Sequence, residues 1–345
     1  MKIGIIGASG YGGVELYRIL SLHPEVTEIN VYTSGAEEIP YEKVYPHLYG
    51  KTTARLQPLN PEYIQNENDC IFLATPSGIS ARLTPQLHNE GIKIIDLSGD
   101  LRLKNPNQYT EWYKKVPAPE TILSQAVYGL SELQAKQIKE GTILANPGCY
   151  PTATLLGLAP VVKENIVKPG SIIIDAKSGV SGAGRKPNLV THFVEVQDNL
   201  SIYKVHEHQH IPEIEQQLHD WDSQIGAITF STHLVPMTRG IMATIYVELK
   251  EDWGNYRLQE LYEQFYAASP FVHIRTDGTF PSTKEVYGSN DCVISIKKDP
   301  RTNRLTIVSV IDNLMKGAAG QAVQNFNMMY GFKETTALDM FPLYP

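Results

Sequence analysis

The chain has 345 residues, of which 42% are hydrophobic and 19% are charged. This balance suits a protein with a large buried core, and it excludes disorder as the state of the whole chain. The formal net charge of −7, without any Lys/Arg-rich run, argues against nucleic acid as the main ligand. A phosphorylated small molecule is not excluded, because backbone N–H groups and one or two cations are enough to bind it.

The length predicts two domains, at roughly 100–200 residues per domain. No apolar run reaches the ~20 residues of a membrane-spanning helix, and residues 1–7 lack the order of a signal peptide. Three cysteines in a chain this long do not make a disulfide framework. We therefore expect a soluble, reduced, cytoplasmic protein.

Residues 1–145 alternate between the patterns of strands and helices. Helical spacing of apolar residues predicts helices at 12–21 and 77–90. Apolar or alternating runs predict strands at 3–6, 28–33, 70–74, 92–97 and 142–145. Strands that are separated by helices pair in parallel, so this part is predicted to form a Rossmann-type, doubly wound parallel sheet of the α/β class.

From about residue 170 strand patterns predominate. They predict strands at 171–176, 199–205, 227–234, 241–250, 271–276, 292–298 and 305–311. Helices are predicted at 212–221 and 256–268, and the short link 299–303, which contains Pro300, fits a hairpin loop. We expect an α+β domain with a mainly antiparallel sheet and helices on one face, followed by a helix rich in small residues at 314–330.

A glycine cluster, Gly7-Ala-Ser-Gly-Tyr-Gly-Gly13, joins the first predicted strand to the first predicted helix. Glycines at this turn let the backbone approach a pyrophosphate, and the helix N-terminus supplies N–H donors. The cluster predicts a dinucleotide site, with a tight turn as the plain alternative. The second strand ends in Tyr32-Thr-Ser-Gly35 without a carboxylate, which favours NADP over NAD.

Cys149 differs from the other two cysteines. Cys70 and Cys292 lie within apolar strand patterns and are expected to be inert core thiols. Cys149 follows a predicted parallel strand and precedes an apolar helix at 153–158, so it lies at the sheet edge that carries the glycine cluster. Because a helix N-terminus stabilises a thiolate, we expect a reactive nucleophile, with a buried structural cysteine as the alternative.

Three histidines, His206, His208 and His210, alternate before a predicted helix, and an extended backbone would point them to one face. They could bind zinc, as in a metal-dependent hydrolase, provide an acid–base partner for Cys149, or be structural. Since Cys and Asp residues elsewhere lack ligand-type spacing, we expect acid–base chemistry and no metal.

Residues 175–185 form a second segment rich in glycines and hydroxyls, again after a predicted strand. With Lys177, Ser178, Ser181 and Arg185, this segment could hold a phosphate or carboxylate group. An ordinary surface loop is the alternative interpretation.

Along its length the chain resembles N-acetyl-γ-glutamyl-phosphate reductases, relatives of aspartate-semialdehyde and glyceraldehyde-3-phosphate dehydrogenases. The Pro-Gly-Cys-Tyr-Pro-Thr motif around Cys149 is specific, since aspartate-semialdehyde dehydrogenases surround their cysteine differently. One departure is Ser34-Gly35, where relatives usually continue with Ser/Arg. The matching segments are Gly7-Ala-Ser-Gly-Tyr-Gly-Gly-Val-Glu-Leu16, Leu97-Ser-Gly-Asp-Leu-Arg102, Tyr128-Gly-Leu130, Asn146-Pro-Gly-Cys-Tyr-Pro-Thr152, the 177–185 segment, His208-Gln-His-Ile-Pro-Glu213, His233-Leu-Val-Pro-Met-Thr-Arg-Gly240 and Lys316-Gly-Ala-Ala-Gly-Gln-Ala322.

The resemblance implies NADPH-dependent, reversible reduction of N-acetyl-γ-glutamyl phosphate to N-acetylglutamate 5-semialdehyde plus phosphate, through a Cys149 thioester, in arginine biosynthesis. It implies an NADP-binding Rossmann domain of residues 1–148 plus 314–345 and a catalytic and oligomerisation domain of residues 149–313. The alternatives are a reductase of N-blocked aminoadipyl or aspartyl phosphate, a zinc hydrolase, and an inactive NADP-sensing module.

The resemblance also implies roles for individual residues. Cys149 is the expected nucleophile and His208 the expected proton donor. Residues expected to bind substrate are Arg102, Ser178, Ser181, His210 and Glu213. Residues expected to bind NADP are Gly7, Ser9, Gly10, Tyr11, Gly12, Gly13, Ser34, Thr75, Ser98, Gly179 and Asn313. The expected partners are the substrate, phosphate and further copies of the chain in a dimer or tetramer, without nucleic acid or membrane.

Overall fold

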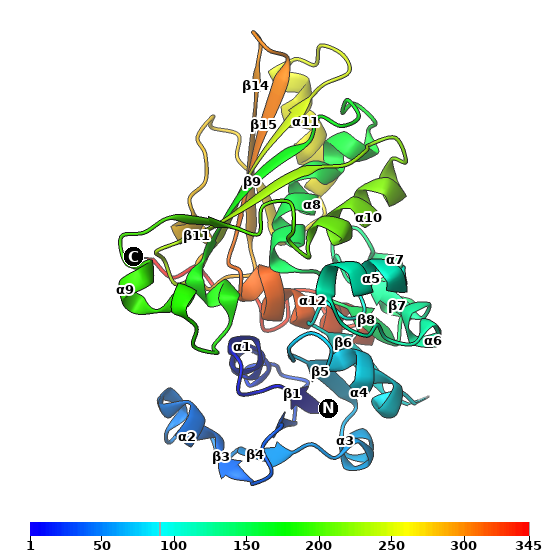
Figure 1. The fold of residues 1–345 in the computed structure, drawn as a ribbon, viewed down its shortest axis with the longest axis vertical. Helices are drawn as coiled ribbons and strands as arrows, with labels where there is room; N and C mark the ends of the chain where they lie inside the picture. Colours follow the sequence, from blue (N-terminus) through cyan, green and yellow to red (C-terminus); the bar gives the residue numbers. More distant parts are fainter. Residues whose placement is uncertain (90, 345) are drawn as a thin grey trace. The chain divides into compact units, whose positions relative to one another are not determined.

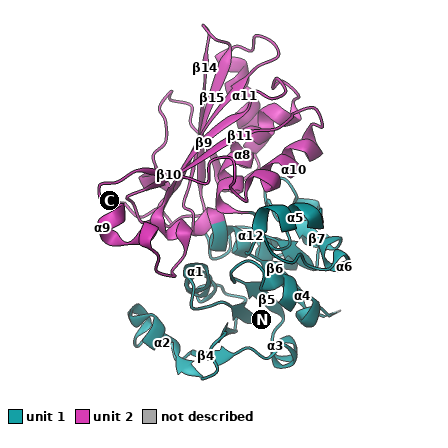
Figure 2. Cartoon of the chain, viewed as in Figure 1, with its two compact units in different colours: residues 1–147, 318–339 teal, residues 148–317, 340–345 magenta. Residues whose placement is uncertain are grey.

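The computed structural model describes residues 1–89 and 91–344, and the chain divides into two compact units (Figures 1 and 2). The first unit comprises Met1–Pro147 and Ala318–Asp339, and the second comprises Gly148–Gly317 and the residues from Met340 onward. The sequence had assigned all of 314–345 to the first domain. Residues 314–317 and 340–344 instead group with the second unit, because they pack among its strands and loops.

The first unit contains a sheet with strand order β3-β4-β2-β1-β5-β6-β8-β7. Every pair is parallel except β3–β4, which confirms the doubly wound parallel sheet. The sequence missed β3, β4 and β7, which are too short to show an alternating pattern. The strands are β1 (Lys2–Ile6), β2 (Glu28–Thr33), β3 (Ile39–Pro40), β4 (Arg55–Pro58), β5 (Cys70–Leu73), β6 (Lys93–Asp96), β7 (Ala126–Tyr128) and β8 (Ile143–Ala145).

Helices flank this sheet, and the last one is buried along most of its length. The helices are α1 (Tyr11–Leu20), α2 (Tyr41–Val44), α3 (Pro61–Glu67), α4 (Ser80–Leu87), α5 (Pro106–Tyr113), α6 (Glu120–Leu123), α7 (Ala135–Glu140) and α12 (Gly320–Tyr330), with a 3₁₀ turn at η1 (Pro46–Leu48). Helix α12 packs against α1 and α7. One of its buried polar side chains bonds within the unit: the Asn325 amide donates to the carbonyl oxygen of Gly129 over 2.8 Å.

Helix α4 is shorter than the predicted 77–90. Gly78 has φ of +87°, which is not helical, and its N–H donates to the Asp100 carboxylate. Asp100 also accepts the N–H of Ala81 at 2.9 Å, so one carboxylate fixes the turn before the helix. At the other end, Glu90 lies outside the described residues.

The second unit contains a sheet with strand order β10-β11-β9-β12-β15-β14-β13. Only β9–β11 and β13–β14 pair in parallel, so the predicted mainly antiparallel sheet is confirmed. The predicted hairpin is also present, with Asp299 of β14 opposite Arg304 of β15. The strands are β9 (Ile173–Gly179), β10 (Ser201–Tyr203), β11 (Thr229–Val235), β12 (Ile241–Glu248), β13 (Val272–Ile274), β14 (Cys292–Asp299) and β15 (Arg304–Ile311).

One face of this sheet is covered by α8, α10 and α11 (Figure 1). Along β12, buried residues alternate with half-buried ones, as expected when only one face packs on helices. The helices and turns are α8 (Cys149–Lys163), α9 (Phe193–Val196), α10 (Ile211–Trp221), α11 (Asn255–Tyr266), η2 (Val180–Ala183), η3 (Leu189–Thr191), η4 (Thr283–Val286) and the π-helix η5 (Met315–Ala319).

Helix α8 is the central helix of the second unit and is longer than the predicted 153–158. Two prolines lie inside it. Pro151 stands in the first turn, where the missing N–H would have no intrahelical partner in any case. Pro160 lies in the last turn and does remove one hydrogen bond from the helix.

That lost hydrogen bond is replaced from α11. Pro160 has no N–H to donate to the carbonyl of Leu156, four residues before it. The hydroxyl of Tyr266 donates to this buried oxygen at 2.5 Å, and the hydroxyl of Tyr262 donates to the next carbonyl, that of Gly157, at 2.7 Å. Tyr266 therefore replaces the hydrogen bond that Pro160 removes, and Tyr262 adds a second hydrogen bond from α11 to α8.

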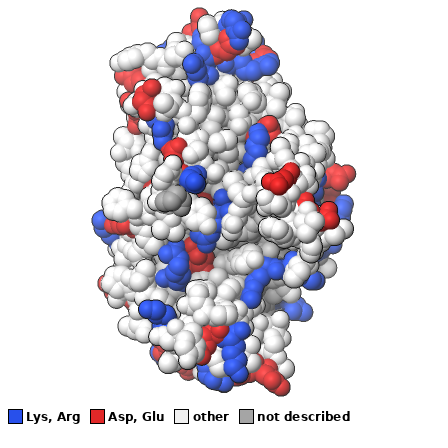
Figure 3. All heavy atoms as spheres, turned by 90° about the vertical axis from the view of Figure 1, so that its left-hand side faces the viewer, with Lys and Arg blue, Asp and Glu red and all other residues white. Residues whose placement is uncertain are grey.

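The surface carries mixed charge. On the face drawn in Figure 3, Lys and Arg are interspersed with Asp and Glu. Among residues 1–89 and 91–344, no helix is long and apolar enough to cross a membrane. The second unit also exposes a set of large apolar side chains between η3 and β10: Leu189, Val190, Phe193, Val194, Leu200 and Ile202.

The Tyr266→Phe variant tests the contact between α11 and α8. It leaves the Leu156 carbonyl without this donor and should lower the free energy of unfolding by about 1–3 kcal/mol. Urea unfolding followed by circular dichroism measures the change. Tyr256→Phe on the same helix is the matched control, because its ring is 82% exposed. Equal midpoints for the two variants would show that the hydrogen bond contributes nothing.

Candidate active site

Cys149 is the first residue of α8, which begins four residues earlier than the sequence predicted, and the residue is partly exposed. The preceding residue, Gly148, is the N-cap, and its N–H donates to Oε1 of Glu213 at 2.8 Å. Glu213 lies fully buried in the first turn of α10. Helix α10 therefore fixes the start of α8, where backbone N–H groups and the partial positive charge of the helix lie beside the thiol.

The other two cysteines are core thiols, as predicted. Cys70 is buried in β5, and its burial raises the pKa of its thiol to about 12. Cys292 is buried in β14, with its sulfur 3.4 Å from the hydroxyl oxygen of Ser309.

His208 lies among aromatic rings, one of which belongs to the residue that follows Cys149. Its ring is 5.5 Å from that of Tyr150, the residue after Cys149, and within 6 Å of the rings of Tyr203, Phe230 and His210. Only 4% of His208 is exposed, and this burial, together with the charge of Lys204, lowers its pKa to about 3. The ring is therefore neutral at physiological pH.

A backbone contact selects the tautomer of that neutral ring. The N–H of His210 donates to Nδ1 of His208 at 3.1 Å. Because Nδ1 accepts a hydrogen bond, the hydrogen of the neutral ring is on Nε2. His208 is thus a hydrogen-bond donor through Nε2.

The histidine segment does not have the extended backbone expected from the sequence. It is a tight turn in which Lys204 and His206 have φ values of +46° and +58°. As a result His206 is exposed, while His208 and His210 are buried. Among the described residues no group of three or more His, Cys, Asp or Glu side chains could hold a metal ion.

The 175–185 segment also differs from its prediction as a loop. Strand β9 continues to Gly179, so Lys177 and Ser178 point to opposite faces of the sheet. Ser178 is buried on the face that packs on α8, whereas Lys177 pairs with Asp175 at 2.7 Å on the other face. Only Ser178 is therefore directed towards the helix that begins with Cys149.

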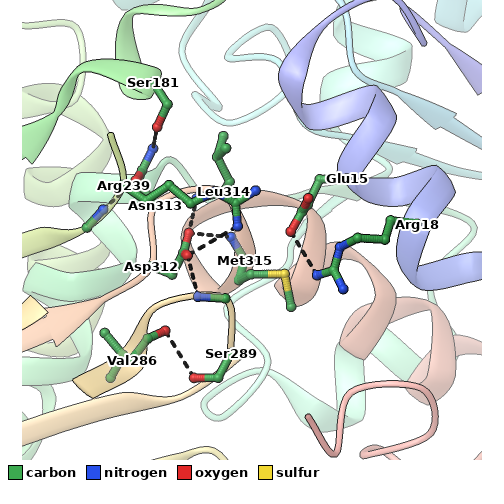
Figure 4. Close-up of polar contacts among 12 residues, drawn as sticks. Glu15, Arg18, Ser181, Arg239, Val286, Ser289, Asp312, Asn313, Leu314 and Met315 are labelled. Carbon is green, nitrogen blue, oxygen red and sulfur yellow. Dashed lines mark hydrogen bonds and ion pairs between the residues drawn. The ribbon is translucent and has the colours of Figure 1, made fainter. Parts of the chain in front are cut away.

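The loop after β9 brings several predicted site residues together. Nδ2 of Asn313 donates to the hydroxyl of Ser181 at 2.9 Å, and its Oδ1 accepts the N–H of Gly240 at 2.8 Å (Figure 4). A Cβ at Gly182 would lie 2.8 Å from Oγ of Ser178 and 3.9 Å from Nδ2 of Asn313. Side chains expected to bind substrate or cofactor thus converge within the second unit.

Sequence reasoning missed two tyrosines of this site. The hydroxyls of Tyr150 and Tyr203 are 3.1 Å apart, and that of Tyr150 donates to the carbonyl of His233 over 3.4 Å. Burial raises the pKa of both hydroxyls, so both remain protonated. Tyr150 stands inside the predicted cysteine motif, but nothing in the sequence indicates that β10 brings Tyr203 to it.

In the first unit, the glycine cluster forms a cradle that fits a dinucleotide. A Cβ at Gly7 would lie 2.4 Å from the carbonyl oxygen of Ala74, and one at Gly13 would lie 2.6 Å from Cα of Ala8. Gly12 has open space instead, with its nearest neighbour at 4.0 Å. Two glycines thus let the loop close tightly, and Gly12 leaves room where a pyrophosphate would approach the start of α1.

The remaining predicted residues of this unit occupy strand ends. Ser34 is exposed after β2, and Thr75 bonds Ser80 at 2.8 Å after β5. The Ser98 hydroxyl donates to the Asp96 carboxylate. Burial of Asp96 and the nearby charge of Asp100 raise the pKa of this carboxyl group to about 6. Arg102 is buried, and it donates to the carbonyl oxygens of Asn146 and Leu97 at 2.8 and 2.9 Å.

Two family models match the chain. One, described as the semialdehyde dehydrogenase NAD binding domain, matches residues 2–141, and the other, the semialdehyde dehydrogenase dimerisation domain, matches residues 149–313. Among solved structures, aspartate semialdehyde dehydrogenase II from Vibrio cholerae, complexed with ASA, has a TM-score of 0.72 at 16% identity, covering 96% of this chain and 98% of that one. Aspartate semialdehyde dehydrogenase with NADP from Candida albicans has a TM-score of 0.68 at 14% identity, covering 95% and 98%.

Curated relatives are much more similar in sequence. The N-acetyl-gamma-glutamyl-phosphate reductase of Bacillus subtilis is 56% identical over 345 residues, which cover 100% of both chains. That of Halalkalibacterium halodurans is 55% identical over the same length, again with 100% of both chains covered. With this degree of identity over its full length, and with a partly exposed cysteine at the start of α8, the chain belongs to the N-acetyl-gamma-glutamyl-phosphate reductase family.

Proposed function

We propose that this protein catalyses the reversible, NADPH-dependent reduction of N-acetyl-γ-glutamyl phosphate to N-acetylglutamate 5-semialdehyde and phosphate, in arginine biosynthesis. The observation that carries this proposal is the Cys149 thiol, partly exposed at the first residue of α8, with the neutral His208 ring packed against the next residue. Membership of the reductase family supports this substrate. We also propose that the reaction takes place in the cytoplasm.

Cys149 performs the first step. Its sulfur attacks the acyl carbonyl and phosphate leaves, which produces a thioester on the enzyme. The negative charge that develops on the carbonyl oxygen is stabilised by backbone N–H groups at the start of α8, an effect typically worth about 3–4 kcal/mol. Gly148 and Glu213 keep these groups in place.

His208 assists through its Nε2–H. Since its ring is neutral, it serves as a hydrogen-bond donor to the oxygen of the thioester and of the thiohemiacetal rather than as a cationic acid. The thiohemiacetal then releases the aldehyde and regenerates the thiolate. Ser178, Ser181 and His210 of the second unit are proposed to bind the substrate. Arg102 of the first unit is also proposed to bind it. The sequence predicted that Glu213 contacts the substrate. We propose instead that this buried carboxylate positions Cys149 through its hydrogen bond with Gly148.

NADP is proposed to bind to the glycine cradle of the first unit. Bound NADPH supplies the hydride that reduces the thioester. The chain would hold its pyrophosphate with N–H groups of the loop 7–13 and the start of α1, whose first turn carries no acidic residue. The end of β2, with exposed Ser34, carries no carboxylate that would repel a 2′-phosphate. The other residues proposed to contact NADP are Thr75, Ser98, Gly179 and Asn313.

We also propose that the chain forms a homo-oligomer, a dimer or a tetramer. Residues 149–313 match a model described as a dimerisation domain. In this unit the sheet face opposite α8 carries half-buried side chains, and the exposed apolar residues between η3 and β10 include Phe193 and Ile202. Both surfaces are suited to burial against further copies of the chain.

The substrate assignment is tested in the reverse direction. The purified enzyme should reduce NADP⁺ with N-acetylglutamate semialdehyde only when phosphate is present, as followed at the absorbance of NADPH. Its kcat/KM should exceed those for the homologues that are one carbon shorter and one carbon longer. A higher value for either homologue would reassign the enzyme to a related acyl phosphate.

The Cys149→Ser variant should lose several orders of magnitude in kcat while its NADPH affinity, measured by fluorescence titration, stays unchanged. The hydroxyl is a far weaker nucleophile than the thiol at neutral pH. Cys292→Ala, in the same unit but in the core, should keep nearly full activity. Near-normal turnover of Cys149→Ser would remove this residue from the mechanism.

His208→Asn tests the neutral ring through stability. The unfolded chain binds a proton at His208 below pH 6.5, whereas the folded chain resists it until about pH 3, so the folded state loses stability as pH falls through this window. The substitution lowers the free energy of unfolding relative to the wild-type enzyme, and this loss should be about 2 kcal/mol smaller at pH 5 than at pH 8. Urea unfolding at both pH values measures this. An equal cost at both would mean that the buried ring is protonated in the folded enzyme.

A further inference from the structure

A glycine of the π-helix η5 lies directly against the nucleophilic residue. A Cβ at Gly317 would be 2.8 Å from Cβ and 3.2 Å from Cα of Cys149, and 3.3 Å from Cδ1 of Ile311. The backbone of Gly317 is not in the left-handed region, so glycine is required here for space and not for conformation. Because the crowding atoms of Cys149 are its Cα and Cβ, no rotation of its side chain makes room.

The turn that carries Gly317 is anchored by a buried carboxylate. Asp312 is fully buried, and its Oδ1 accepts the N–H groups of Leu314 and Met315 at 2.8 and 3.2 Å. Its Oδ2 accepts the N–H of Gly288 at 2.7 Å and pairs with Arg239 at 3.3 Å (Figure 4).

A backbone hydrogen bond also holds Gly317 in place. Its N–H donates to the carbonyl oxygen of Asp312, five residues before it, at 3.0 Å, which is the hydrogen bond of a π-helix. Asp312 thus holds the turn through its carboxylate and through its own carbonyl. Gly317 has little freedom to move away from Cys149.

We propose that Gly317 is a positioning residue for Cys149: the π-helix held by Asp312 and Arg239 forms a fixed backbone wall behind the nucleophile and sets the place of its sulfur. Cys149 is then held from two sides, by η5 at its Cα and Cβ and by the Glu213 contact at Gly148. This inference rests on the proposed role of Cys149 and assigns no contact with substrate to Gly317.

A second glycine of the same unit provides a control that distinguishes positioning of Cys149 from ordinary core packing. Gly157 lies further along α8, where an added Cβ would meet Cδ1 of Ile245 at 3.1 Å and Cγ2 of Ile307 at 3.3 Å. These atoms are the ends of side chains in the core, and Cys149 is not among them. Gly157→Ala therefore crowds α8 without crowding the nucleophile.

The experiment compares Gly317→Ala with Gly157→Ala in the full-length enzyme. Gly317→Ala should lower kcat about 100-fold with little change in KM, since displacing a reacting group by about 1 Å costs a factor of this size. It should also change the rate and the pH dependence of Cys149 alkylation by iodoacetamide in the protein without NADP. Gly157→Ala should lower the melting temperature yet leave kcat and alkylation within twofold of the wild-type values.

Three results would overturn the proposal. The first is a folded Gly317→Ala enzyme with normal kcat. The second is normal alkylation of Cys149 in Gly317→Ala. The third is an equal loss of kcat in Gly317→Ala and Gly157→Ala. The alkylation readout does not depend on turnover. Failure of the proposed function would appear as an active Cys149→Ser enzyme, and failure of this inference as normal alkylation in Gly317→Ala.

A double variant covers the case in which Gly317→Ala does not fold. Adding Ile311→Val removes the Cδ1 atom that lies 3.3 Å from the new methyl group and leaves both contacts with Cys149 in place. The double variant should recover the folded state and keep the loss of kcat and the altered alkylation. Full recovery of activity would show that Ile311, and not Cys149, is the residue that the glycine accommodates.

Discussion

The hydrogen bond between the N–H of Gly148 and the buried carboxylate of Glu213 fixes the point at which α8 begins. A helix start leaves its first N–H groups without intrahelical partners, and the chemistry proposed here requires those groups beside the Cys149 thiol. Glu213 accepts the N–H of Gly148, the residue before Cys149. The N–H groups that follow remain at the start of the helix. The packing of α10 against α8 therefore helps to place Cys149 as the proposed mechanism requires.

Burial has opposite consequences for the groups around this helix start. His208 loses its charge because desolvation in an aromatic environment disfavours the imidazolium form, and the N–H of His210 then selects the tautomer. The hydroxyls of Tyr150 and Tyr203 keep their protons for the same reason. The site thus presents neutral hydrogen-bond donors, which suit an oxygen that becomes negative only during the reaction.

Two buried carboxylates of the second unit, Glu213 and Asp312, are used in the same way. Each accepts backbone N–H groups, and each thereby fixes a short segment next to Cys149. Hydrogen bonds from backbone N–H groups to a carboxylate are strong, and they help to offset the cost of burying these acids. Asp312 adds an ion pair with Arg239, which ties the end of β15 to the residues just before β12.

The sequence by itself determined the two-part architecture, the parallel and antiparallel sheets, the glycine cluster and the exceptional cysteine. These features follow from local patterns: apolar periodicity, the positions of Gly and Pro, and a residue type that chemistry requires at a helix start. Even the family and its reaction were accessible, because a motif such as Pro-Gly-Cys-Tyr-Pro-Thr is contiguous. Short strands such as β3 and β7 were missed, because two or three residues show no period.

Tertiary structure alone decided which groups surround Cys149. The turn at 204–210 separates His206 from His208, and the extension of β9 places Lys177 and Ser178 on opposite faces. Tyr203 reaches Tyr150, the residue after Cys149, and Gly317 reaches Cys149 itself, through strand order and helix packing that no local pattern encodes. Such contacts join residues far apart in the chain, and their energies depend on burial and close approach that exist only after the chain has folded.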